Sequence, residues 1–266
     1  MPRYRVGCTG WSYDDWRGVF YPEGTPAGEY LARYARVFDL VEVDSSFYRP
    51  PTPFLTRRWA AATPPGFLFA PKVPKAITHI RGGPPIAESV GAFVEALRPL
   101  RDAGKLGPIV AQFAASFRRE KDSDRLDEIL GAFPPDLPFA VELRHRSWWV
   151  PDTLRRLERR RAALVWTVYP GLEPPFWVPG EFLYARFVGD RALTTFDRIQ
   201  RDGRPTMEAM RARLESEGAA ARDAFLLVNN HFMGFGPGTA ELLQRVLGVP
   251  PADLGAAARE RGQRTL

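Results

Sequence analysis

Polar side chains that can transfer protons or bind ions recur along the chain, each near the end of a short apolar run or just after it. Glu42 and Glu142 lie near the ends of two such runs, and Lys72 follows a third. Two carboxyl groups whose surroundings drive their pKa values apart can serve as a general acid and a general base. We therefore assign acid–base roles to Glu42 and Glu142, and include Lys72 and His79 among the candidate catalytic residues.

Further cations and amides fit the binding of an anion. Arg144 and Arg186 could each hold a phosphate or carboxylate through two parallel hydrogen bonds, with Lys72 as a mobile point charge. Charged groups in an apolar setting must pair with one another or with a ligand. The competing interpretation is a self-satisfied ring in which Glu42 pairs with Lys72 and Glu142 pairs with Arg144. The candidate ligand-binding residues are Trp11, Tyr48, Arg144, Arg186, Asn229, Asn230 and His231.

The three histidines, His79, His145 and His231, also follow apolar runs. Together with Glu42 and Glu142 they could form a divalent-metal site that activates water. No local ligand spacing such as H-E-x-x-H supports such a site. We therefore leave the cofactor unassigned, do not favour a metal, and expect His79 and His231 to carry protons.

Eight apolar or β-branched runs position these polar residues. Short runs of this kind, bounded by turn residues, are typical of buried parallel strands. Apolar stripes at helical spacing, such as Val90, Phe93 and Leu97, separate most of the runs. The runs span residues 5–9, 40–44, 67–70, 108–113, 139–143, 163–167, 182–187 and 225–229.

Eight strand–helix units in 266 residues match the size of an α/β fold of the TIM-type (β/α)8 barrel class. We expect residues 1–266 to form one such domain. Prolines at 170, 174, 175 and 179 exclude a regular helix from residues 168–181. The sixth helix is therefore predicted to be missing or replaced by a proline-rich loop. A doubly wound open sheet is the alternative, but no early G-x-G-x-x-G supports it.

In a TIM-type barrel the loops after the strands build the active site at the C-terminal mouth, and three loops here are distinctive. Residues 10–27 are rich in aromatic side chains, which predicts a lid or plug for the mouth, or a binding pocket. Residues 188–205 carry four arginines and form a loop long enough to be functional or mobile. Residues 229–239 contain three spaced glycines, which could receive an anion or simply begin a helix.

Composition excludes several other classes of protein. With 45% hydrophobic and 26% charged residues, the chain is neither disordered nor collagen-like. Its single cysteine, Cys8, cannot form an internal disulfide. No apolar run approaches the roughly 20 residues that cross a bilayer, so we expect no membrane partner and a cytoplasmic location. The net charge of +6 is carried almost entirely by arginine.

Several motifs together resemble one known family. Residues 7–13 (GCTGWSY), 41–49 (VEVDSSFYR), 140–148 (AVELRHRSW) and 229–231 (NNH) are similar to signatures of the "domain of unknown function 72" family, also called YecE-like. The resemblance covers nearly the whole chain and implies a TIM-type barrel, but it carries no established activity. Its motif positions coincide with Glu42, Lys72, His79, Glu142, Arg144, Arg186 and Asn229.

The leading functional hypothesis is an enzyme with hydrolase- or lyase-like acid–base chemistry. Its substrate would be a phosphorylated or otherwise anionic small molecule, bound at the C-terminal mouth of the barrel. Positive charge and the arginine-rich loop support an alternative, a nuclease-like hydrolase that processes nucleic acid. A non-catalytic ligand-binding or scaffold barrel is a second alternative. The sequence leaves open the substrate, the reaction type, metal dependence and the oligomeric state.

Overall fold

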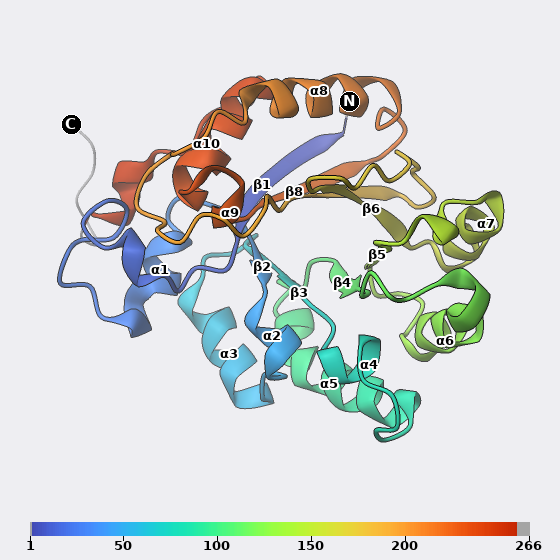
Figure 1. The fold of residues 1–266 in the computed structure, drawn as a ribbon. Coiled ribbons are helices and arrows are strands. Elements are labelled where there is room, and N and C mark those ends of the chain that lie inside the picture. The colour runs from blue at the N-terminus through green and yellow to red at the C-terminus, as the bar shows by residue number, and fades with distance from the viewer. Residues whose placement is uncertain (1, 260–266) are drawn as a thin grey trace.

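Strands and helices alternate along the chain, as the hydrophobic pattern predicts. A computed structural model describes residues 2–259, in which eight parallel strands curve around a common axis with helices outside them (Figure 1). Neighbouring strands follow the order β3-β2-β1-β8-β7-β6-β5-β4. The strands are β1 (Arg3–Thr9), β2 (Leu40–Val43), β3 (Leu68–Pro71), β4 (Ile109–Gln112), β5 (Phe139–Glu142), β6 (Ala163–Val168), β7 (Phe182–Phe187) and β8 (Asp223–Val228).

The barrel closes between β3 and β4 through an interrupted seam. Within the described residues, these two edges meet at isolated bridges, Phe69 with Leu106 and Lys72 with Val110. Three backbone hydrogen bonds support the seam: Phe69 N to Lys105 O at 2.9 Å, Gly107 N to Phe69 O at 2.7 Å, and Val73 N to Val110 O at 2.9 Å. On the opposite side, β1 and β8 pair continuously over six residues.

Helices follow most of the strands and cover the outside of the barrel. Proline begins α3 and α7, where its missing N–H has no helical partner to lose. Among residues 2–259, four 3-10 turns lie at Asp14–Trp16, Ala27–Glu29, Arg146–Trp148 and Leu254–Ala257. The α-helices are α1 (Tyr30–Tyr34), α2 (Ser45–Tyr48), α3 (Pro53–Ala62), α4 (Lys75–Thr78), α5 (Ile86–Asp102), α6 (Arg119–Ala132), α7 (Pro151–Arg160), α8 (Arg204–Ser216), α9 (Asn230–Met233) and α10 (Gly236–Val246).

The sixth unit lacks its helix, which confirms the prediction from its prolines. Residues 169–181, all of them described, run from β6 to β7 without a helix. The Trp166 indole N–H donates to the Trp177 carbonyl at 2.9 Å, and the Phe176 ring packs edge-on against Trp166 at 5.0 Å. The Arg213 guanidinium lies 4.8 Å from the Phe176 ring centroid. Aromatic side chains of the proline-rich segment thus cover a strand that a helix covers elsewhere.

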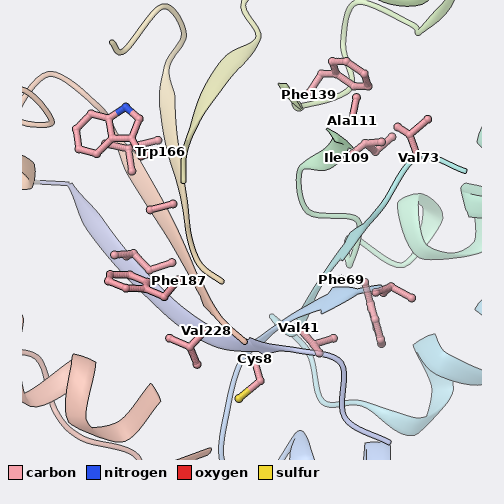
Figure 2. Packing of buried hydrophobic residues seen from close by; sticks show 14 of the residues in the cluster. Cys8, Val41, Phe69, Val73, Ile109, Ala111, Phe139, Trp166, Phe187 and Val228 are labelled. Carbon is pink, nitrogen blue, oxygen red and sulfur yellow. The ribbon is translucent and has the colours of Figure 1, made fainter. Parts of the chain in front are cut away.

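Alternate residues of each strand enter two separate apolar cores. The outer core packs strands against helices; Figure 2 shows part of it, including Val41, Phe69 and Phe187. Cys8 is buried in this core as a free thiol. The inner core fills the barrel, and successive side chains on a strand point to opposite faces. The inner residues are Leu40, Ala70, Val110, Ala140, Ala163, Val165, Tyr184, Phe225 and Leu227.

Among the described residues, no helix has both the length and the apolar character needed to span a membrane.

Candidate functional site

A polar layer lies directly above the inner core, at the C-terminal ends of the strands. Because side chains alternate, the residue two positions after an inward apolar residue also faces inward. Glu42 stands in this relation to Leu40, and Arg186 to Tyr184. The same spacing accounts for Lys72, Gln112, Glu142 and Asn229.

Arg186 joins the two glutamates at the centre of this layer. Its Nη2 donates to Glu42 Oε1 at 2.6 Å, and its Nη1 donates to Glu142 and to Gln112 Oε1. The Tyr184 hydroxyl donates to the second oxygen of Glu42 at 2.8 Å. Both glutamate side chains are buried completely. One guanidinium thus links strands β2, β4, β5 and β7.

The charges of this network hold Glu142 in its ionised form. Burial alone would favour the neutral carboxyl, but the Arg186 and Arg144 charges outweigh it and lower the pKa of Glu142 to about 2. Arg186 loses solvation too, yet Glu42 and Glu142 raise its pKa well above the usual value. Glu142 is therefore an anion at neutral pH and has no proton to donate.

The strand-end charges do pair with one another, as the competing interpretation has it, but Glu42 and Lys72 have other partners than expected. Glu142 does pair with Arg144, whose Nε donates to it at 2.6 Å. Glu42 pairs with Arg186 rather than with Lys72. The correction follows from reach: an arginine side chain that crosses the barrel interior from β7 meets both glutamates at once.

Lys72 is directed instead toward the pocket wall. Its Nζ donates to Asp44 at 2.7 Å and to Gln112 Oε1 at 3.1 Å, and lies 4.6 Å from the Phe47 ring centroid. Burial would raise the pKa of Asp44, but the charges of Lys72 and Arg186 prevail and lower it. Asp44 is therefore a carboxylate whose charge is already compensated.

These groups line a pocket of about 730 Å³ at the C-terminal mouth. Its lining contains four cationic side chains and one carboxylate, since Glu42 and Glu142 lie beneath the floor. The lining residues are Tyr13, Asp44, Phe47, Tyr48, Lys72, His79, Gln112, Arg144, Tyr169, Arg186, Val188, Gly189, Arg191, Phe196, Asn229, Asn230 and His231.

Most candidate residues from the sequence meet in this pocket. Trp11 is outside its lining: the indole packs edge-on against Trp59 and Phe69, at 5.4 Å and 6.2 Å between ring centroids. Trp11 lines a neighbouring cavity of about 170 Å³, which shares Tyr13 and Asp44 with the main pocket. The candidates that do line the main pocket are Tyr48, Lys72, His79, Arg144, Arg186, Asn229, Asn230 and His231.

Two of the three histidines reach the pocket. His79 packs against Phe47 at 5.0 Å between ring centroids, and partial burial together with the Lys72 and Arg144 charges lowers its pKa below 6.5. His231 Nδ1 lies 3.0 Å from the Leu193 carbonyl. His145 lies outside the pocket lining. Between residues 2 and 259, no three His, Cys, Asp or Glu side chains are grouped so that they could hold a metal ion.

The asparagines after β8 organise the chain that follows them. Asn229 Nδ2 donates to Thr9 Oγ1 at 2.8 Å, while Asn230 Oδ1 accepts from Gly236 N at 2.8 Å and from the Trp16 indole at 3.3 Å. The Gly236 amide is thus already bonded. The glycine-rich segment begins helix α10, which is one of the two roles expected for it from the sequence.

The two remaining loops, residues 10–27 and 188–203, both bring side chains to the pocket. In the aromatic loop, Trp16 and Tyr21 are buried in the outer core, and Tyr13 reaches the pocket. After β7, residues 188–203 form an irregular loop that brings Arg191 and Phe196 to the pocket. The Phe196 ring packs edge-on against His231 at 4.9 Å.

Some pocket residues were not among the sequence candidates. Asp44 and Gln112 follow the same alternation as the chosen residues, so strand parity alone identifies them. Phe47, Tyr169, Arg191 and Phe196 come from irregular segments, where no periodicity indicates which side chains turn inward.

Fold and pocket together define the class of this protein: a TIM-type α/β barrel with a polar, cation-rich pocket at the C-terminal ends of its strands. The family described as Protein of unknown function DUF72 matches residues 5–264. The chain belongs to this family, which confirms the resemblance seen in its motifs.

Two curated relatives match roughly half of the chain. The UPF0759 protein YunF of Bacillus subtilis (strain 168) is 32% identical over 150 residues, which are 55% of this chain and 52% of YunF. The UPF0759 protein YecE of Escherichia coli (strain K12) is 28% identical over 144 residues, which are 54% of this chain and 49% of YecE. The match therefore spans about half the length of each curated relative.

Solved structures resemble the chain over nearly its whole length. The crystal structure of a DUF72 family protein from Thermotoga maritima MSB8 has a TM-score of 0.80 at 25% identity, covering 92% of this chain and 99% of that one. A DUF72 family protein from Enterococcus faecalis V583 has a TM-score of 0.76 at 24% identity, covering 94% and 99%. These neighbours have the same barrel fold.

Proposed function

We propose that the pocket at the mouth of the barrel binds a phosphorylated or otherwise anionic small molecule, and that the protein is an enzyme with hydrolase- or lyase-like acid–base chemistry there. One observation carries the proposal. Lys72, Arg144, Arg186 and Arg191 line the pocket, and these four cations outnumber the three carboxylates, Asp44, Glu42 and Glu142, with which three of them pair.

The cations that face the cavity would hold the anion. Lys72 extends from the end of β3 and Arg144 from the end of β5, and both belong to the lining. Arg144 donates to Glu142 through Nε, so its terminal nitrogens remain for a ligand. Arg186 is committed to the glutamates and contributes its charge from below.

The acid–base roles fit His79 and Asp44 better than the buried glutamates. His79 is neutral at pH 7 because its pKa is lowered, so it can accept a proton, and it opens on the cavity. Asp44 is ionised and lines the same cavity. In this proposal Glu42 and Glu142 position Arg186 and Arg144, without touching the substrate.

Anion binding is tested by titrating the protein with inorganic phosphate in a calorimeter. We expect binding by the wild-type protein and a loss of affinity of about ten-fold in Lys72→Gln and in Arg144→Gln, since a charge-assisted hydrogen bond contributes roughly 1.5 kcal/mol or more. Lys121→Gln is the matched control, because Lys121 is exposed on α6 and outside the pocket. An equal loss in the control, or no binding by the wild type, would reject the pocket.

Catalysis is tested separately with a panel of phosphate monoesters and phosphorylated lyase substrates. We expect turnover by the wild-type protein that falls by at least about 100-fold in His79→Gln, the scale of general acid–base catalysis. If phosphate binds but none of the compounds is turned over, the protein is a non-catalytic ligand-binding barrel and the enzyme hypothesis is rejected.

A further inference from the structure

An unusually basic stretch lies between the second and third units of the barrel. Residues 45–87 contain no aspartate or glutamate, although they contain six lysines and arginines. Many surface arginines elsewhere have an acidic partner nearby in the sequence, as Arg155 has in Asp152 and Arg222 in Asp223. The acid-free stretch therefore leaves positive charge that its own segment cannot compensate.

Part of this charge lies on or directly beside α2, α3 and α4, which are on the same side of the barrel (Figure 1). Arg49, Arg57, Arg58 and Lys75 are exposed, and none makes an ion pair with another described residue. Arg81, by contrast, pairs with Asp122. We call the group Arg49, Arg57, Arg58 and Lys75, with the side chains between them, the basic face.

Large apolar side chains are interleaved with these cations. Tyr48 is 63% exposed and Phe54 is 66% exposed, far more than the rings of the core. The Lys75 Nζ lies 5.8 Å from the Tyr48 ring centroid, and the Arg58 guanidinium lies 6.0 Å from that of Phe54. Two aromatic rings thus remain open to solvent beside cations on the same face.

We propose that the basic face binds single-stranded nucleic acid. Cations along a surface attract the phosphates of a strand, and exposed rings provide platforms on which unpaired bases stack. Within residues 45–87 the large apolar side chains that are exposed are Tyr48, Phe54, Leu55 and Ile80, fewer than the apolar face that an interfacial helix inserts into a bilayer. A folded duplex hides its bases from such rings, which favours the single strand.

This proposal is independent of the small-molecule function, because Arg49, Phe54, Arg57 and Arg58 lie outside the pocket lining. Tyr48 is shared, since it lines the pocket and is also exposed beside the basic face. The variants that test the proposal therefore leave Tyr48 and Lys75 unchanged.

The test is fluorescence anisotropy of a labelled oligothymidylate of about 15 nucleotides, titrated with the full chain. The four cations predict that the logarithm of the binding constant falls with the logarithm of salt concentration with a slope of about −3. Replacing Arg49, Arg57 and Arg58 by Gln together should reduce that slope to about −1. Phe54→Ala should weaken binding about ten-fold and leave the slope unchanged, because stacking is not ionic.

A triple variant of equal charge is the control: Arg155→Gln, Arg222→Gln and Arg245→Gln, three exposed arginines with acidic partners. It should bind the strand like the wild type. The proposal is overturned if the control loses as much affinity as the basic-face variant, or if the strand does not bind at low salt. Binding to phosphatidylserine vesicles in place of the strand would also overturn it. Phosphate titration should be unchanged in the basic-face variants, which separates this result from failure of the pocket.

Discussion

Arg186 is the residue on which the mouth of the barrel depends, since one guanidinium bonds Glu42, Glu142 and Gln112. Burying these charges costs solvation, which the pairs must repay through close hydrogen bonds. Removing one partner leaves the others without compensation. The network is therefore sensitive to single substitutions and holds the floor of the pocket in one arrangement.

Replacing Glu142 by Gln tests this network. We expect the free energy of unfolding to fall by about 3–5 kcal/mol, the usual cost of breaking a buried ion pair. The measurement is urea unfolding at pH 7, with Glu158→Gln as the control, because Glu158 is exposed on α7. A loss below about 1 kcal/mol would show that the network is dispensable for folding.

The same variant has a predictable pH dependence. The pKa of Glu142 is about 2 in the folded protein against an ordinary value of 4.5. A lowered pKa stabilises the folded state fully above pH 4.5, and this stability is lost as the pH falls toward 2. Subtracting the unfolding curves of Glu142→Gln from those of the wild type should reveal that loss; parallel curves would contradict it.

His79 predicts a pH-dependent affinity for anions. Its pKa lies below 6.5, so the ring becomes cationic as the pH falls through that lowered value. Sulfate keeps its charge over this range, and its affinity should rise several-fold toward pH 5 as the pocket gains a positive charge. In His79→Asn the titrations should show less dependence on pH. A profile identical to that of the wild type would remove His79 from the site.

At the scale of elements, the loop of residues 188–203 connects the site to the rest of the molecule. The Phe196 backbone N–H donates to Asp15 at 2.7 Å, which attaches the loop to the segment after β1. Gly189 begins the loop at a φ of 69°, and a Cβ there would lie 2.3 Å from the His231 carbonyl oxygen. Glycine is therefore required where the loop turns over the pocket.

Arg191 on this loop is expected to bind the anion from the side of β7. Arg191→Gln should weaken phosphate binding about three- to ten-fold, as expected for one exposed charge contact. Arg198→Gln on the same loop is the control, since Arg198 pairs with Asp197 and lies outside the pocket lining. Equal titration curves for wild type and Arg191→Gln would place Arg191 outside the binding set.

Some features of the strands, helices and loops could be predicted from the sequence alone, and others could not. Strand positions were predictable because alternating burial leaves a pattern, and the missing sixth helix because proline cannot continue one. The same parity located Lys72 and Arg186 at the mouth and Glu142 beneath its floor. The partner of Glu42 was not predictable, because side-chain reach across the barrel depends on coordinates. The irregular loop likewise gave no sign that Phe196 covers the pocket.

At the scale of the whole molecule, the seam between β3 and β4 is the place where the barrel should open first. Local opening follows the density of hydrogen bonds and contacts. We expect the amides of Phe69, Val73 and Gly107 to exchange with deuterium through an opening of lower free energy than those of the β1–β8 pairing. Native-state hydrogen exchange measures both; equal protection at the two sites would contradict the prediction.

The seam also has a thermodynamic consequence. Lys72 stands just beyond one edge of it, and its Nζ bonds to Gln112 across the gap at 3.1 Å. An anion held jointly by Lys72 and Arg144 would span the same gap and hold its two edges together. Ligand at 100 times its dissociation constant would then stabilise the closed barrel by about 2.7 kcal/mol. Ligand binding and closure of the barrel would thus be linked equilibria. Without its ligand, the protein would open more often at the seam between β3 and β4, where the ligand is held.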